Sequence, residues 1–93
     1  MIKSFKCKET ECIFRLQGSR RFPPNLQPIA LRKLRMLNRS TTLEDLRIPP
    51  ANRLEKLQGS RANQWSIRIN QQWRICFEWH QGNAFKVEIV DYH

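Results

Sequence analysis

The chain reads QWSIRINQQWRICFEWH over residues 64–80, and this stretch decides the fold. Apolar and polar side chains alternate on both sides of a short polar bend. Such alternation is typical of two half-buried strands joined by a hairpin. We therefore expect strands over residues 64–70 and 73–80.

The two faces of this predicted hairpin differ in chemistry. One face carries the apolar side chains Trp65, Ile67, Ile69, Trp73, Ile75, Phe77 and Trp79. The other carries Ser66, Arg68, Arg74, Cys76 and Glu78. Because antiparallel sheets often face water on one side, we expect helices to cover the apolar face and the polar face to stay open to solvent or a ligand.

The flanking sequence extends this hairpin into a small α+β domain. Further strands are expected over residues 1–6, 53–58 and 84–90, the last with Phe85, Val87 and Ile89 on its buried face. Helical spacing predicts helices over residues 8–17 and 26–38, and one more helical turn at 42–46 capped by Thr41 or Thr42. The expected fold has two N-terminal helices packed on one face of a small, mainly antiparallel sheet.

The second predicted helix is amphipathic and basic. Its buried stripe should be Leu26, Ala30, Leu34 and Leu37. Its basic residues, which should point elsewhere, are Arg32, Lys33, Arg35 and Arg39.

Length and composition favour one cytosolic domain over residues 1–93. The chain has no run close to the roughly 20 apolar residues of a membrane span, and its start is too polar for a signal peptide. Its three cysteines are an odd number without zinc-ligand spacing, which favours plain thiols in a reducing compartment.

The charge of the chain is strongly positive and unevenly distributed. Seventeen Lys and Arg residues stand against eight Asp and Glu, for a net charge of +9. Between Glu11 and Glu44 there is no acidic residue at all. Such a segment indicates binding to phosphate backbones or to an acidic protein; the alternative is a solvated basic face without a binding role.

Most enzyme motifs are missing from the sequence. It contains no Gly-rich phosphate loop, no nucleophile elbow and no paired metal ligands, so we expect no cofactor and no metal. Metal-free RNA cleavage remains open, since it needs only a base, an acid and cations that stabilise the charged phosphorane.

The residues for that chemistry lie in the second half of the chain. Arg74 can contact a phosphate through two hydrogen bonds, with Lys56 and Arg68 nearby. His93 can transfer protons near its reference pKa of about 6.5, and Tyr92 can stack on a base. The alternative is that Asp91-Tyr92-His93 is only a polar tail.

Several blocks of this sequence resemble the HigB branch of the RelE/ParE toxin superfamily. They are residues 53–59 (RLEKLQG), 65–70 (WSIRIN), 73–77 (WRICF) and 90–93 (VDYH), together with the segments 1–6 and 46–50. The order and spacing of the blocks make the resemblance specific, and it spans the whole chain.

The resemblance implies a RelE-like, microbial-RNase-like fold and the toxin of a type II toxin–antitoxin system. Such a toxin cleaves translated mRNA on the ribosome and inhibits translation. Its partners would be a HigA-type helix-turn-helix antitoxin, the ribosome and mRNA, with operator DNA bound only through the antitoxin complex. The implied catalytic residues are Arg74, Asp91, Tyr92 and His93.

The chain departs from the family at two positions. Some members have His in place of Glu55 and Lys in place of Gln58. Glu55 can then act as a base or be merely structural, and the adjacent Lys56 lies on the other face of the strand. Lys56, Arg68, Arg32, Lys33 and Arg35 are the candidate RNA-binding cations.

Two other functions remain open at this stage. The chain could be a non-catalytic RNA- or ribosome-binding module, or a degenerate toxin that acts as a transcriptional co-regulator by binding the antitoxin. Neither would cleave RNA.

Overall fold

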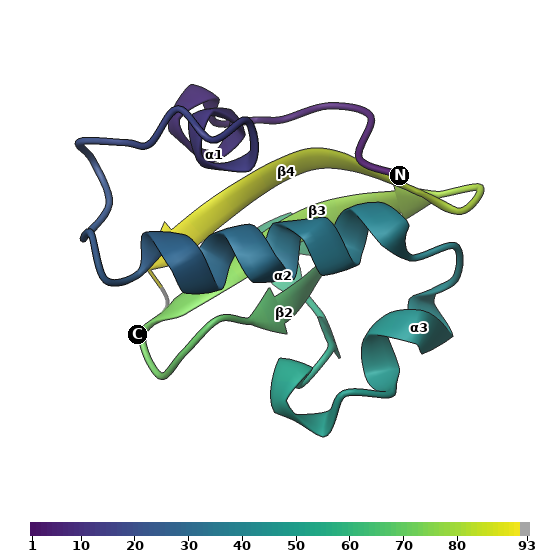
Figure 1. Cartoon of the computed structure of the whole chain (residues 1–93). Coiled ribbons are helices and arrows are strands. Elements are labelled where there is room, and N and C mark those ends of the chain that lie inside the picture. Colours follow the sequence, from purple (N-terminus) through teal and green to yellow (C-terminus); the bar gives the residue numbers. More distant parts are fainter. Residues whose placement is uncertain (92–93) are drawn as a thin grey trace.

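The computed structural model describes residues 1–91, and its elements follow the predicted order (Figure 1). The helices are α1 (Lys8–Phe14), α2 (Gln27–Arg39) and α3 (Leu43–Arg47), with short 3-10 helices η1 (Pro50–Asn52) and η2 (Gly59–Arg61). The strands are β1 (Glu55–Lys56), β2 (Gln64–Arg68), β3 (Trp73–His80) and β4 (Asn83–Asp91). They form an antiparallel sheet in the order β1-β2-β3-β4, so the predicted α+β fold is confirmed.

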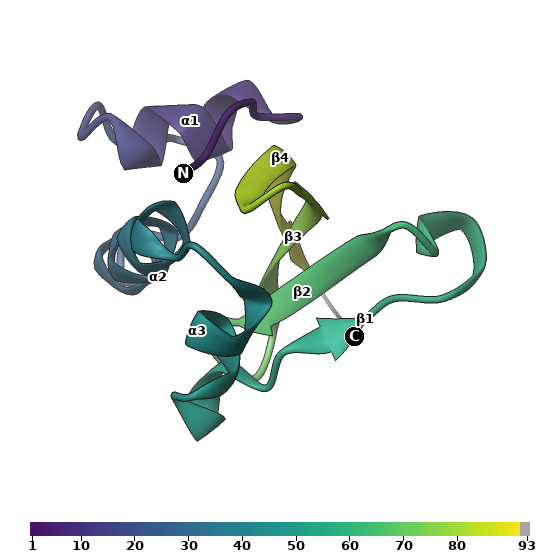
Figure 2. The same ribbon diagram turned by 90° about the vertical axis from the view of Figure 1, so that its right-hand side faces the viewer.

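Helices α1 and α2 lie on the same side of the sheet (Figure 2). The predicted stripe of α2 is confirmed, because Leu26, Ala30, Leu34 and Leu37 are all buried. Their partners in the core are the apolar residues of β2, β3 and β4, among them Ile67, Ile75, Phe77, Val87 and Ile89. Within the described residues, every helix falls short of the length and apolar character needed to cross a membrane.

The short helix α3 begins at the predicted cap. The Thr42 hydroxyl accepts a hydrogen bond from the Asp45 amide, and the Asp45 carboxylate accepts from the Thr42 amide. This reciprocal capping box satisfies amides that have no partner inside the helix. Hydrogen bonds from the Thr41 and Thr42 amides hold the pKa of Asp45 below its ordinary value.

Lys33 is an exception on α2, and the expectation that it points away from the buried side of the helix is wrong. Its side chain is buried, and Nζ donates a hydrogen bond to Oδ1 of Asn52. Asn52 is itself fully buried and donates to the Leu46 carbonyl. Burial, with the nearby charge of Arg32, lowers the pKa of Lys33. The pair joins α2 to the irregular segment that follows α3.

A bulge in β4 overturns the expected face of Phe85. Lys86 has a positive φ of 53°, and the β3–β4 register shifts between Cys76 and Glu78. The extra residue puts Phe85 opposite Glu78 and leaves Ala84 and Val87 on the helix-covered face. Phe85 is therefore half-buried on the polar face, where its ring lies 5.5 Å from that of His80.

The N-terminal segment lies along the outer edge of β4 but forms no continuous strand. It makes two isolated parallel bridges, Ile2 with Ala84 and Phe5 with Val87. Since the Lys86 bulge lies between these bridges, the ladder is interrupted, and the Lys86 amide bonds the Ser4 hydroxyl at 2.9 Å instead. The prediction of a regular strand at residues 1–6 is wrong for this reason.

Two elements are shorter than predicted because the backbone turns left-handed. Arg53 has φ 44°, so the extended chain of β1 begins only after it. Leu16 has φ 63°, and α1 ends at Phe14 rather than near Gln17. The spacing of apolar residues in the sequence does not reveal a single residue with a positive φ.

Candidate active site on the polar face of the sheet

The polar face of the sheet is buried at its centre, contrary to the expectation that this face stays open. Ser66, Arg74 and Cys76 are exposed by only 0%, 6% and 1%. Residues 53–61, which include the edge strand β1 and the 3-10 helix η2, are attached to this face at two points. Arg53 offers its carbonyl to Arg74, and Arg61 pairs with Glu88 on β4. Residues 53–61, which contain no α-helix, therefore lie against the buried polar groups.

Arg74 is the centre of this face, and its guanidinium is fixed by hydrogen bonds. Nε donates to the Ser66 hydroxyl at 2.8 Å, and Nη2 donates to the Arg53 carbonyl at 2.6 Å. Nη2 also lies 3.4 Å from the Ser66 carbonyl oxygen. Because the planar guanidinium offers several donors in a fixed fork, these bonds orient it without neutralising its charge.

Two further predicted site residues, Arg68 and Glu55, lie close to Arg74. Arg68 is its direct partner in the β2–β3 register, so the two arginines share one face. Like charges directly opposite one another destabilise a sheet. Oε2 of Glu55 lies 3.9 Å from Nη2 of Arg74, and the Glu55 side chain is 52% exposed. An anion bound beside the two arginines would relieve their repulsion.

The far end of the polar face carries a separate ionic cluster. Glu88 is the register partner of Cys76, and its carboxylate accepts from Arg61 at 3.2 Å and lies 3.5 Å from Nζ of Lys6. Burial raises the pKa of the Cys76 thiol, so this cysteine is held in its protonated, unreactive form. The cluster fastens residues 53–61 and provides no nucleophile.

Asp91 lies on the opposite face from Arg74. It pairs with Trp73 in the β3–β4 register, whereas Arg74 pairs with Val90. Successive residues of a strand point to opposite faces. The Asp91 carboxylate accepts a hydrogen bond from Nε2 of Gln72 at 3.1 Å. The structure thus separates Asp91 from Arg74, while Tyr92 and His93 lie outside the described residues.

The remaining predicted RNA-binding residues lie away from Arg74. Lys56 shares the face of Trp65, and its Nζ lies 5.8 Å from the centre of the Trp65 ring. Arg32 and Arg35 are exposed on α2, which covers the other face of the sheet. Lys33 is buried against Asn52. Of the predicted cations, the structure brings only Arg68 beside Arg74.

Sequence reasoning missed the groups that orient Arg74. Ser66 was expected only as a polar position on an open face, and the Arg53 carbonyl is a backbone group. A serine flanked by Trp65 and Ile67 carries no signal of its burial. Among residues 1–91, no three His, Cys, Asp or Glu side chains converge in a way that could hold a metal ion.

A family profile and two named relatives place the chain in the same protein family. A family profile described as "RelE-like toxin of type II toxin-antitoxin system HigB" matches residues 3–93. Toxin HigB-1 of Vibrio cholerae is 42% identical over 65 residues, covering 70% of this chain and 68% of that protein. An uncharacterized protein of Haemophilus influenzae is 41% identical over 64 residues, covering 69% and 63%. Endoribonuclease HigB of Proteus vulgaris is 30% identical over 93 residues, the full length of both chains.

Proposed function

Because the chain belongs to the HigB family of RelE-like toxins of type II toxin–antitoxin systems, we propose that it is an endoribonuclease that cleaves translated mRNA on the ribosome without a metal ion. Cleavage of mRNA inhibits translation, and the protein acts in the cytoplasm, where the ribosomes are. Its antitoxin is a HigA-type helix-turn-helix protein, and the complex of the two binds operator DNA.

The observation that carries the proposal is the pair Arg74 and Arg68. Arg74 is oriented by Ser66 and the Arg53 carbonyl, and Arg68 lies directly opposite it on the same face. Arg74 presents an oriented guanidinium, and Arg68, whose Nε donates to the Asn70 carbonyl at 3.0 Å, adds a second positive charge on the same face. Such charge favours an anion, and a phosphodiester is the anion that an RNase must hold. In the reaction the two arginines stabilise the extra negative charge of the phosphorane.

Proton transfer is assigned to Glu55 and His93. Glu55 is half-exposed and 3.9 Å from Arg74, which lets it accept the proton of the 2′-hydroxyl beside the bound phosphate. The 2′-oxygen then attacks phosphorus, and the bond from phosphorus to the 5′-oxygen breaks. His93 donates a proton to the leaving 5′-oxygen, and the products are a 2′,3′-cyclic phosphate and a 5′-hydroxyl.

The other predicted residues are given supporting roles. Tyr92 stacks on a base next to the cleaved bond. Asp91 faces away from Arg74 and acts as a positioning residue for the two that follow it. Lys56, on the edge strand β1, contacts the RNA backbone beyond the cleaved phosphate.

The first test is the conservative variant Arg74→Lys, which keeps the charge but loses the planar fork. Wild-type protein induced without antitoxin should arrest growth and leave cuts in translated mRNA, mapped by primer extension. Arg74→Lys should lower cleavage about 10²- to 10³-fold, as removal of one transition-state donor does. Arg61→Lys, at the ionic cluster on the same face, is the matched control and should cleave normally.

Three outcomes would contradict the proposal. Normal cleavage by Arg74→Lys would remove Arg74 from the site. Binding to ribosomes without cuts from the wild-type protein would favour a non-catalytic binding module. If this chain changes the gel shift of operator DNA by the antitoxin, and the mRNA is not cut, the protein would be a transcriptional co-regulator.

Glu55 is tested separately by Glu55→Gln, which keeps the shape of the side chain and removes its basicity. A general base contributes about 10²- to 10⁴-fold, so cleavage should fall by at least the lower figure. If cleavage falls less than threefold, Glu55 is not the general base and serves only as a counter-ion of Arg74. Deletion of His93, the proposed proton donor to the 5′-oxygen, should also lower cleavage in the same assay.

A further inference from the structure

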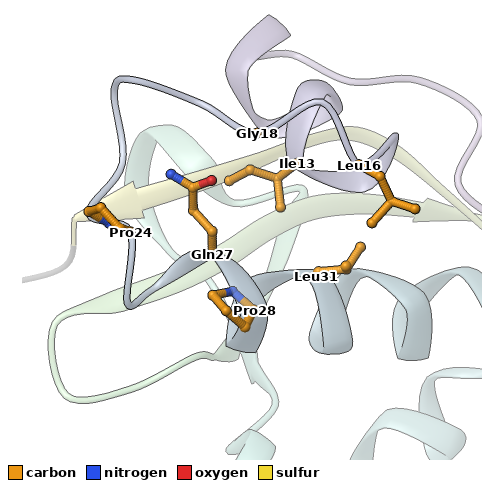
Figure 3. A pocket seen from close by; sticks show the side chains of 7 residues that line it. All are labelled: Ile13, Leu16, Gly18, Pro24, Gln27, Pro28 and Leu31. Carbon is orange, nitrogen blue, oxygen red and sulfur yellow. The ribbon is translucent and has the colours of Figure 1, made fainter.

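A second surface, unrelated to the polar face, lies between α1 and α2. It is a groove of about 360 Å³ whose walls are mainly aliphatic (Figure 3). The residues that line it are Ile13, Leu16, Pro24, Gln27, Pro28 and Leu31, together with Gly18. Leu16 extends from the end of α1 toward Leu31 on α2. The space is large enough for one or two apolar side chains of another molecule.

Leu16 is unusual in its position. It is 69% exposed, one of three large apolar residues exposed within the described chain. Its left-handed backbone holds it at the rim of the groove instead of in the core. An apolar side chain at such a rim contributes little to folding, and its burial by a partner would stabilise a complex.

The wall of the groove formed by α2 continues into a basic stripe. Pro28, Leu31, Arg32 and Arg35 follow the spacing i, i+3, i+4, i+7, so they share one side of the helix. Arg32 and Arg35 are exposed, and no carboxylate of residues 1–91 lies within ion-pair distance of either. The sequence from residue 12 to residue 43 supplies no acid that could neutralise them.

We propose that this groove docks an acidic amphipathic segment of the antitoxin. An apolar side chain of that segment inserts between Leu16 and Leu31, and its carboxylates pair with Arg32 and Arg35. The inference rests on the antitoxin partner that the toxin family implies, and it does not depend on RNA cleavage.

RNA is the competing occupant of a basic surface, and the groove favours protein instead. Phosphates would pair with Arg32 and Arg35, but they would leave the aliphatic groove empty. Single-stranded RNA docks its bases by stacking on aromatic rings, and none of the groove residues is aromatic. An amphipathic peptide satisfies the groove and the stripe together.

The test measures antitoxin affinity and toxicity in parallel. The probe is the antitoxin encoded next to the toxin gene, purified and titrated onto each toxin variant. Leu16→Asp should raise Kd about 30-fold, the effect of an interface hot spot. Ile48→Asp is the matched control, since Ile48 is similarly exposed at 75% but lies outside the groove. It should bind as the wild type does.

A second groove variant guards against misfolding. Leu16→Gly removes the side chain and suits the positive φ, so it should fold normally and also bind weakly. Both Leu16 variants should still arrest growth when expressed without antitoxin. Loss of antitoxin binding with retained toxicity would therefore show that the variants affect docking alone. If the wild-type protein were not toxic, the proposed function would be wrong, but the binding result would still stand.

The basic stripe is tested by the double variant Arg32→Glu/Arg35→Glu. It should weaken antitoxin binding about tenfold at low salt and less at high salt. Lys3→Glu/Lys8→Glu, the same change of charge on two exposed lysines elsewhere, is its control. Unchanged antitoxin affinity in Leu16→Asp would overturn the proposal. So would a stripe variant that loses ribosome co-sedimentation but keeps its antitoxin affinity, since the surface would then bind RNA.

Discussion

The two faces of the sheet are both buried at their centres, and they are chemically opposite. Ile67, Ile75 and Phe77 on one face are fully covered by α2 and the core around it. Ser66 and Arg74 on the other face are also buried, but they are held by hydrogen bonds to one another and to the Arg53 carbonyl. A buried charge is costly, and well-packed apolar residues in its place are often neutral or stabilising. The buried Arg74 is therefore a candidate functional residue, because its burial is not explained by stability.

Phe77→Ala should produce the largest change in the free energy of unfolding. Phe77 is fully buried on the helix-covered face, and truncation of such a residue typically costs about 3–5 kcal/mol. Urea denaturation of the purified toxin measures the loss. A loss below about 1 kcal/mol would contradict the view that this face carries the main core.

Ser66→Ala should have a smaller effect on stability and a distinct one on activity. It removes the hydroxyl that accepts from Nε of Arg74, and loss of a buried hydrogen bond to a charged group costs about 1.5–3 kcal/mol. Cleavage should also fall, since the guanidinium loses its orientation. We expect at least a tenfold decrease in the rate of cleavage at saturating ribosomes.

Cys76→Ala is the matched control for Ser66→Ala. Cys76 is the register partner of Ser66 and is equally buried, and its neighbours are Glu88 and Arg61 at the ionic cluster. It should lose some stability and keep its cleavage rate. Equal losses of cleavage in both variants would mean that Ser66 supports only the fold.

Glu78→Gln should have the smallest effect, and the effect should depend on pH. Hydrogen bonding from His80, with the charge of Lys86, lowers the pKa of Glu78 from its ordinary 4.5. The ionised carboxylate therefore stabilises the fold above pH 4.5, and that contribution is lost as the pH falls through the lowered pKa. Wild type and variant should differ slightly in Tm at pH 7 and converge in acid. A difference that grows on acidification would refute this assignment.

The helix-covered face could be predicted from sequence because its signal is periodic. The stripe of α2 and the bounds of β3 follow directly from spacings of 3.6 and 2 residues, and both are confirmed. Phe85 was placed on the wrong face because one left-handed residue, Lys86, breaks the period of β4. Pattern analysis assumes that the period continues.

The environment of Arg74 could not be predicted in the same way. Its importance follows from the family resemblance, but its burial depends on where residues 53–61 pass. That path is fixed by the left-handed Arg53 and by the pairing of Arg61 with Glu88, 27 residues away. Lys33 was misplaced for a similar reason, since its partner Asn52 lies in η1, 19 residues further along the chain. Polar contacts between residues far apart in the sequence produce no regular spacing of residue types, so they cannot be predicted from the pattern.

The outer edge of β4 has a consequence for how the toxin behaves at high concentration. The amides of Ala84, Lys86, Val87 and Ile89 are all capped by groups from the first ten residues: the Met1 carbonyl, the Ser4 hydroxyl, the Ser4 carbonyl and the Thr10 hydroxyl. At the other edge, β1 is only two residues long. Open sheet edges are where chains pair with one another and aggregate. Both edges of the sheet therefore offer little open backbone for pairing with a second copy of the chain.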